Sequence, residues 1–193
     1  MLYEFKHTKN HFDQDFEGIE FCIRALSKNK DEMRIQCMHL HVARNIMTGT
    51  DGSRIHVYDL RDKFPKGWYR VIKKTRGYIA LYRDPKIKEI RLTYSHLFPK
   101  PQKPYDPQDP KNPKNPEPVR TISIETEHNL TEAVYKINTE TNTALNIDFV
   151  KDLKGYYEMT IPEPDDPEEG LTGNQPLYFK ANRKQAVIMP CMK

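Results

Sequence analysis

The sequence lacks long hydrophobic runs and is poor in cysteine, and both features exclude classes of protein. No apolar run approaches the ~18 residues of a membrane-spanning helix, and the first residues lack the basic and apolar regions of a signal peptide. The three cysteines, Cys22, Cys37 and Cys191, are too far apart for a Cys-x-x-Cys motif. We therefore expect a reduced, cytoplasmic protein that does not associate with membranes.

The sequence also lacks the common catalytic and cofactor motifs. It contains no glycine-rich phosphate loop and no nucleophile elbow. His39 and His41 share one side of a predicted strand, and with His56 and Asp51 they offer zinc-binding side chains. No fuller ligand set accompanies them, and paired strand histidines are more often structural or exposed. We expect a protein that is not an enzyme and has no catalytic residue, metal or cofactor.

Charge is abundant, and its two signs are unevenly distributed. With 193 residues, of which 37% are hydrophobic, the chain is large enough for a real core. Residues 1–120 carry nine more Lys and Arg than Asp and Glu, whereas residues 121–193 carry five fewer. This asymmetry suits a molecule with one face toward phosphates, and it equally suits a solvated surface with a chance imbalance.

Hydrophobic periodicity predicts an α+β protein. Ile19, Cys22 and Leu26 recur at helical spacing and predict a helix over 17–30, and the alternation that follows predicts a strand over 33–42. The other predicted elements are a strand at 54–60, a hairpin of 68–74 with 78–83, strands at 90–94, 120–125, 133–139 and 144–147, a helix at 148–155, a strand at 156–161, an acidic loop at 162–174, and a final hairpin of 177–181 with 186–189.

A proline-rich segment at 99–118 divides the chain. Proline recurs there at every third residue from Pro104 to Pro116, a spacing that stacks the rings on one edge of a polyproline II helix. Such a segment is neither a helix nor a central strand. We interpret it as a semi-rigid loop or linker, with a proline-groove ligand as the alternative. It separates a first half at 1–98 from a second half at 119–193, and we expect both halves to form one domain.

Three short segments are the most informative part of the sequence. Gly49 to Ile55 contains Asp51-Gly52, a tight-turn signal, and opens a strand. Ala186 to Lys193 is an apolar strand that stops at Pro190. Together with Asn146 to Leu153, in this order, they resemble the sliding clamp of bacteria and phages, the β subunit of DNA polymerase III. Clamp chains have three domains and about twice this length, so the chain resembles a divergent member of single-domain size.

This resemblance implies a fold and a function. The implied fold is a clamp-like domain of two βαβββ-type halves, with antiparallel sheets and two helices. The implied function is a processivity factor that encircles or contacts duplex DNA non-specifically and recruits a polymerase or other clamp-binding proteins. The resemblance also allows a homo-oligomeric ring. The alternative is a monomeric clamp-fold module that regulates another protein and forms no ring.

The resemblance also implies a pocket for a short peptide. Departures from the family pattern occur here, since Ser53 replaces a histidine and Cys191 a methionine. The alternative is structural: Val187, Ile188 and Met189 would be core residues, and Arg54 would pair with a carboxylate. The two motifs would meet within one domain or across a subunit boundary. The implied pocket residues are Thr50, Gly52, Arg54, Ile55, Asn146, Phe149, Val187, Ile188, Met189, Pro190 and Met192.

The second implied surface faces DNA. Clamp helices present Lys and Arg to phosphates without reading bases. A solvated helix face is the alternative for each residue taken singly, and Asp148 and Asp152 weaken the case for the second helix. The implied DNA-binding residues are Arg24, Lys28, Lys30, Lys73, Lys74, Arg76, Lys151 and Lys154.

Overall fold

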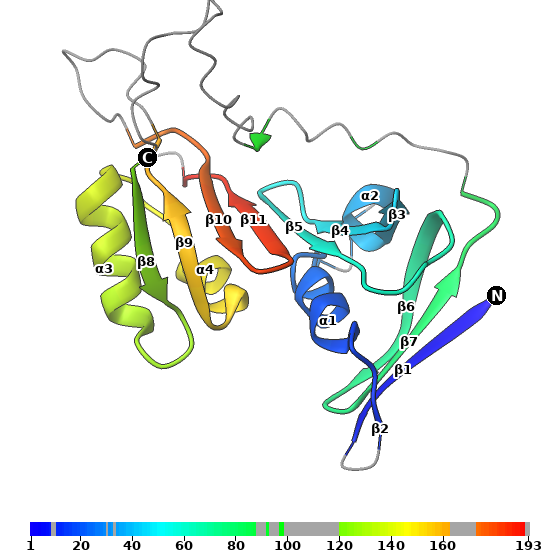
Figure 1. Ribbon diagram of the computed structural model, residues 1–193. Helices are drawn as coiled ribbons and strands as arrows, with labels where there is room; N and C mark the ends of the chain where they lie inside the picture. The colour runs from blue at the N-terminus through cyan, green and yellow to red at the C-terminus, as the bar shows by residue number, and fades with distance from the viewer. Residues whose placement is uncertain are drawn as a thin grey trace, which may run out of the picture.

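The computed structural model describes residues 1–8, 11–29, 31–32, 34–87, 92, 97–98, 120–162 and 173–191. The proline-rich segment, nearly all of the predicted strand at 90–94 and most of the acidic loop lie outside these residues. The described residues form one antiparallel sheet with helices packed on it (Figure 1). The α+β class predicted from periodicity is therefore confirmed.

Eleven strands make up the sheet, in the order β2-β1-β7-β6-β3-β4-β5-β11-β10-β9-β8. Each half of the chain supplies one contiguous part of it, and the two parts meet where β5 pairs with β11. The strands are β1 Leu2–Thr8, β2 His11–Phe12, β3 Leu40–Ala43, β4 Ile46–Thr50, β5 Arg54–Asp59, β6 Gly67–Thr75, β7 Tyr78–Arg83, β8 Thr121–Glu125, β9 Tyr156–Thr160, β10 Leu177–Ala181 and β11 Lys184–Ile188.

Four helices occur among the described residues: α1 Phe16–Arg24, α2 Ile35–Met38, α3 Leu130–Thr141 and α4 Ile147–Leu153. Helix α1 packs on β4 and β5 and touches α4, while α3 covers β8. We call the sheet surface beneath α1 and α4 the helix face, and the opposite surface the open face. No described helix is long and apolar enough to cross a membrane.

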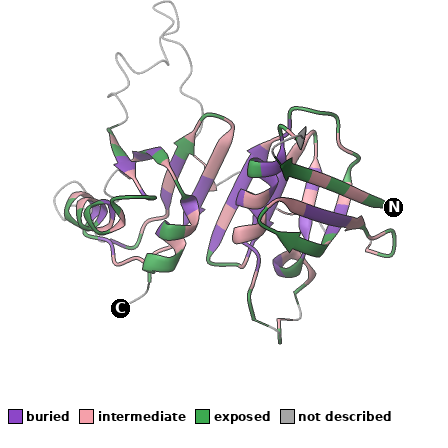
Figure 2. Cartoon of the chain, turned by 90° about the horizontal axis from the view of Figure 1, so that it is seen from below, coloured by how far each residue is buried: buried purple, intermediate pink, exposed green. Residues whose placement is uncertain are grey.

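The core lies between the helices and the helix face. Side chains alternate along a strand, so opposite partners in the register share a face. Met47 of β4 pairs with Tyr58 of β5, and both are buried with Leu40 and Leu81 in one apolar cluster. On the other side of the seam the same cluster contains Phe179 and further residues of α3 and α4. Figure 2 shows the buried residues, in purple, concentrated along the strands.

Two glycines bring α1 unusually close to the sheet. A Cβ on Gly18 of α1 would overlap the ring of Tyr58, and a Cβ on Gly49 of β4 would overlap the carbonyl of Cys22. Gly18 thus allows α1 to lie close to Tyr58 of β5, and Gly49 allows it to lie against the backbone of β4. Asp15 fixes its first turn by accepting hydrogen bonds from the Tyr58 hydroxyl (2.8 Å) and the Arg61 amide (2.9 Å).

Several predicted elements are confirmed. The hairpin at 68–74 and 78–83 is β6–β7, and the final hairpin is β10–β11. The predicted strands at 54–60, 120–125 and 156–161 are β5, β8 and β9, and the helix at 148–155 is α4.

Other predictions are wrong. The helix predicted at 17–30 ends at Arg24. Of the strand predicted at 33–42, only residues 40–42 belong to β3, because 35–38 form α2. The strand at 133–139 is part of α3: Ala133, Ile137 and Thr141 recur every fourth residue and are its buried side. Residues 144–146 are not a strand but lead into α4. Strand β1 was not predicted.

Candidate functional site

The seam between β5 and β11 brings the two sequence motifs together. Ile188 lies opposite Arg54, and Val187 lies opposite Ile55. Beyond the strand, the Met189 amide donates to the Ser53 carbonyl (2.9 Å), so the tail continues along the turn. The motifs therefore meet within one chain on neighbouring strands, which settles whether the two segments need a subunit boundary to come together.

The tail also reaches the third segment. The Cys191 amide donates to the carbonyl of Ala144 (2.9 Å), two residues before Asn146. The Asn146 side chain accepts from the Asp148 amide (2.9 Å) and caps α4. All three segments singled out in the sequence thus converge at one end of the seam.

Local hydrogen bonds shape the turn that opens β5. The Asp51 carboxylate accepts from the amides of Ser53 (2.9 Å) and Arg54 (3.1 Å), as expected for an Asx turn. The Thr50 hydroxyl accepts from the Gly52 amide (3.0 Å) and donates to the Arg54 carbonyl (2.7 Å). Gly52 has a φ of 92°, which favours glycine. The turn is therefore rigid and specified by its own residues.

Arg54 forms the centre of this end of the seam. Its side chain is 3% exposed, and its guanidinium forms ion pairs with Asp51 (3.0 Å) and Asp152 (2.8 Å). It also donates to the carbonyl of Arg24 (2.7 Å) and lies 4.4 Å from the centroid of the Phe149 ring. Pairing of Arg54 with a carboxylate, the structural alternative, is confirmed. Arg54 ties β5 to the ends of both α1 and α4.

The pocket candidates differ in accessibility and in the face they occupy. Thr50, Arg54, Val187 and Ile188 are buried, whereas Gly52 and Asn146 are exposed. Four further candidates are half-buried: Ile55, Phe149, Met189 and Pro190. Met192 lies outside the described residues. The register places Thr50, Ile55 and Val187 on the open face and Arg54 and Ile188 on the helix face. The ten described candidates thus surround the end of the sheet and do not share one wall.

Arg34 belongs to the same neighbourhood and was not predicted. Its guanidinium lies over Gly52, at the distance where an added Cβ would be in tight contact, and it donates to the Asp51 carbonyl (3.4 Å). Glu32 holds it by a salt bridge of 2.8 Å. The sequence carries no signal for this placement, because no local motif links residue 34 to the turn at Asp51-Gly52.

Three of the DNA-binding candidates are engaged with carboxylates. Arg24 and Lys74 both pair with Glu20, at 2.7 and 3.1 Å, and Lys28 lies 3.5 Å from Asp152. Burial alone would raise the pKa of Glu20, but Arg24 and Lys74 hold that pKa below its ordinary value. These cations are partly neutralised, which reduces the positive charge that α1 presents.

The other described DNA-binding candidates are exposed. Lys151 lies in α4 and Lys154 directly follows it, and Arg76 lies in the β6–β7 turn beside a cavity that Glu17 and Glu20 also line. Lys73 pairs with Ala80 in the register, opposite in orientation to Lys74, so it lies on the open face. Lys30 lies outside the described residues. The helix face therefore presents Lys28, Arg76, Lys151 and Lys154 to solvent.

The histidines fill structural positions. His56 is fully buried, stacks on Phe21 with ring centroids 4.1 Å apart, and places Nδ1 2.8 Å from the Phe21 carbonyl. Burial lowers the pKa of His56 to about 3, so the ring is neutral and Nδ1–H donates. His41 packs against Trp68. In the described part of the chain, no three His, Cys, Asp or Glu side chains gather as metal ligands would.

The arrangement of strands and helices matches solved structures of bacterial DNA polymerase III β chains. The chain aligns over its whole length with 65% of the DNA polymerase III β chain from Streptococcus pneumoniae TIGR4 (TM-score 0.53, 8% identity). It aligns equally fully with 64% of DNA polymerase III subunit β from Borrelia burgdorferi, solved with a natural product (TM-score 0.52, 9% identity). The chain has the fold of a DNA sliding clamp. A DNA polymerase sliding clamp from Pseudomonas aeruginosa is also similar (TM-score 0.50, 8% identity, 100% of this chain and 66% of that chain).

The sliding-clamp fold is visible in structure and not in overall sequence. No protein-family model matches the chain, and no curated protein matches it by sequence. The chain spans less than two thirds of the S. pneumoniae, B. burgdorferi and P. aeruginosa clamp chains that it matches. At 7–9% identity the likeness establishes the fold, and function has to be argued from the residues of this chain.

Proposed function

We propose that the protein is a non-enzymatic, clamp-like processivity factor that holds duplex DNA against its helix face and recruits partner proteins through a short peptide. The observation that carries this proposal is the meeting of three clamp-like segments, at 50–55, 146–149 and 187–190, at one end of the β5–β11 seam. The proposal is supported by their convergence on a clamp fold, because segments that are 91 and 38 positions apart in the sequence have no local reason to meet.

The peptide would bind on the accessible residues at this end of the seam. Met189, Pro190 and Ile55 provide half-buried apolar surface, which suits the apolar side chains of a short linear motif. Buried Ile188 and Val187 would support this surface from below. Arg34 and Asn146 would supply polar groups at its rim.

A peptide-binding assay tests this surface. We expect Met189→Asp to weaken binding of a labelled clamp-binding peptide from a bacterial DNA polymerase by roughly tenfold or more, since a buried apolar contact becomes charged. The matched control is Ile72→Asp, an exposed apolar residue of β6 away from the seam, which should change the affinity less than twofold. Equal affinities in folded Met189→Asp and wild type would contradict the peptide site.

Mass in solution tests the ring. A homo-oligomeric clamp gives a multiple of the 22.8 kDa chain mass by light scattering, and it stays on closed circular DNA until that DNA is linearised. A strict monomer at micromolar concentration, released equally fast from circular and linear DNA, would instead support the regulatory module without a ring.

A further inference from the structure

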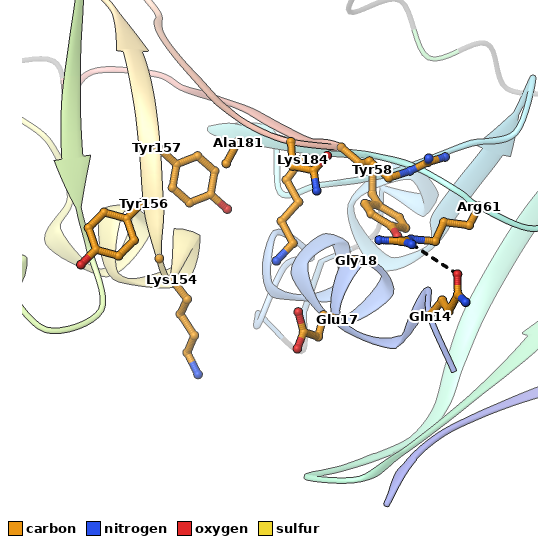
Figure 3. Close-up of a pocket in the computed structure, with 13 residues that line it drawn as sticks. Gln14, Glu17, Gly18, Tyr58, Arg61, Lys154, Tyr156, Tyr157, Ala181 and Lys184 are labelled. Carbon is orange, nitrogen blue, oxygen red and sulfur yellow. Dashed lines mark hydrogen bonds between the residues drawn. The ribbon is translucent and has the colours of Figure 1, made fainter. Parts of the chain in front are cut away.

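A polar cavity of about 250 Å³ lies at the opposite end of the β5–β11 seam from the three motif segments. Its walls come from α1, the residues that open β9, and the β10–β11 turn (Figure 3). Four of its lining residues are basic, against a single carboxylate, Glu17. The basic residues are Arg61, Lys154, Arg183 and Lys184.

Lys184 is the most informative of these residues. It lies opposite Tyr58 in the register, on the helix face, and its side chain descends beside α1 (Figure 3). It is half-buried, with Nζ 5.8 Å from the centroid of the Phe21 ring, and burial lowers its pKa below the ordinary value. Among the described residues, none forms an ion pair with Lys184. Glu17 and Glu20 only partly offset the burial of this charge, so a bound anion would lower the cost further.

Lys154 faces the same cavity from a strained backbone. Its φ of 51° and ψ of 109° are rarely adopted by a residue with a Cβ, and Gly155 follows at a φ of 112°. Lys154 is the C-cap residue of α4, where a positive φ is common. Neither Lys154 nor Lys184 forms a salt bridge with a described carboxylate. Lys154 thus adds a second cation to the cavity rim, from a different element.

Two arginines are held in place around these lysines. Arg183 donates from Nε to the Asp59 carbonyl (2.6 Å) and from Nη2 to the Leu60 carbonyl (2.7 Å), which locks its planar group. Arg61 donates to the Gln14 side chain (3.3 Å). The four cations therefore line one small volume from three parts of the fold, and Arg183 is held by its two backbone carbonyls before any ligand arrives.

We infer that this cavity binds a phosphate group of a nucleic-acid backbone. A phosphate carries its charge on several outward oxygens, so it can accept from donors that converge from different directions, as they do here. The cavity opens on the same side of the sheet as α1 and α4, so the inference rests on the proposed contact of this face with DNA. The inference adds Lys184, Arg61 and Arg183 to the residues that would contact DNA, and none of them was among the predicted DNA-binding residues.

Binding of duplex DNA and of inorganic phosphate by matched variants tests the inference. Lys184→Met removes the buried charge and keeps the length of the side chain, and Lys154→Asn removes the rim charge while tolerating positive φ. The control is Lys180→Met, an exposed lysine that the register places on the open face. We expect either cavity variant to weaken duplex binding roughly tenfold and to lower the salt slope by about one, and the control to do neither.

The measurement with inorganic phosphate distinguishes a failure of this inference from a failure of the proposed function. In wild type, phosphate should raise the thermal midpoint above that in chloride at equal ionic strength, and Lys184→Met should abolish the rise. If wild type responds to phosphate but binds no duplex, DNA contact fails while the anion cavity stands. If wild type binds duplex and folded Lys184→Met and Lys154→Asn bind it as tightly as Lys180→Met does, the cavity inference is overturned. A phosphate response retained in Lys184→Met would overturn it as well.

Discussion

Arg54 and Asp152 form an ion pair of 2.8 Å although 98 positions separate them in the sequence. The pair joins β5, in the first half of the chain, to α4, in the second half. Arg54 also holds Asp51 in the turn that opens its own strand. One buried guanidinium therefore fixes both the local turn and the long-range seam at which the three clamp-like segments meet.

Removing Arg54 should destabilise the protein strongly. Arg54→Met leaves two carboxylates without their buried partner, and we expect a loss of roughly 3 kcal/mol in the free energy of unfolding, measured by urea denaturation. Lys28→Met is the matched control, because Lys28 contacts the same Asp152 at 3.5 Å from a side chain that is 75% exposed. It should cost less than about 0.5 kcal/mol. Similar losses in both variants would refute the central role of Arg54.

The close contact between α1 and β5 predicts that the effect of Gly18→Ala on the free energy of unfolding reverses its sign when the Tyr58 ring is removed. Gly18→Ala should destabilise the wild-type protein by about 1–3 kcal/mol, because the new methyl group overlaps the Tyr58 ring. In a Tyr58→Ala background the overlap disappears, and the same substitution should stabilise by roughly 0.5–1 kcal/mol through helix propensity. A double-mutant cycle of unfolding free energies measures both effects. A destabilisation that persists without the Tyr58 ring would show that another contact is responsible.

His56 should make stability depend on pH. Its pKa is about 3 in the folded state, through burial first and then through Arg54 and Arg24, whereas the ordinary value is 6.5. Asp152 and the bond to the Phe21 carbonyl oppose this shift. Between these two pKa values only the unfolded state binds the proton, so the stabilisation is complete above pH 6.5 and is lost as pH falls. The slope is up to about 1.4 kcal/mol per pH unit.

Comparison of unfolding free energies at pH 7 and pH 5 measures this dependence. His56→Asn keeps a donor toward the Phe21 carbonyl but does not titrate, so the difference between the two pH values should shrink by roughly 2 kcal/mol. Burial also lowers the pKa of His39, which leaves a smaller dependence of the same sign in the variant. An unchanged dependence in His56→Asn would exclude His56 as its source.

The two faces of the sheet should contribute differently to DNA binding. Lys28→Gln combined with Lys151→Gln removes two exposed cations beside the helices and should lower the slope of log K against log salt by about two. Lys73→Gln combined with Lys180→Gln removes the same charge from the open face and should leave the slope nearly unchanged. Duplex anisotropy over a range of salt concentrations compares them. Equal slopes in the two double variants would mean that net charge, and not the helix face, drives binding.

Elements specified by local signals were predictable from the sequence. The β6–β7 and β10–β11 hairpins have short turns between alternating strands, and α4 has its capping Asn146. Helix α3 was missed because Val134 and Ile137 favour strands locally, while the buried spacing of Ala133 and Ile137 becomes decisive only once α3 packs on β8.

The sequence showed the segments of the candidate site but not their arrangement. The turn at Asp51 and the tail at Pro190 were visible as motifs, yet their pairing depends on a register between distant strands. That register alone decides that Ile55 lies on the open face and Arg54 on the helix face. The cavity around Lys184 was invisible for the same reason, since its walls come from three segments that only the folded sheet brings together.

The β5–β11 pairing has a consequence for synthesis on the ribosome. About 130 residues separate the paired positions, so β5 emerges and can pair with β4 long before β11 exists. At roughly 5–20 residues per second, the delay is on the order of 10 s. Throughout it, the free edge of β5 exposes Ile55 and Val57 in an extended segment that can pair with other chains. We therefore expect the first half of the nascent chain, before β11 is made, to be the species most prone to pair with other chains.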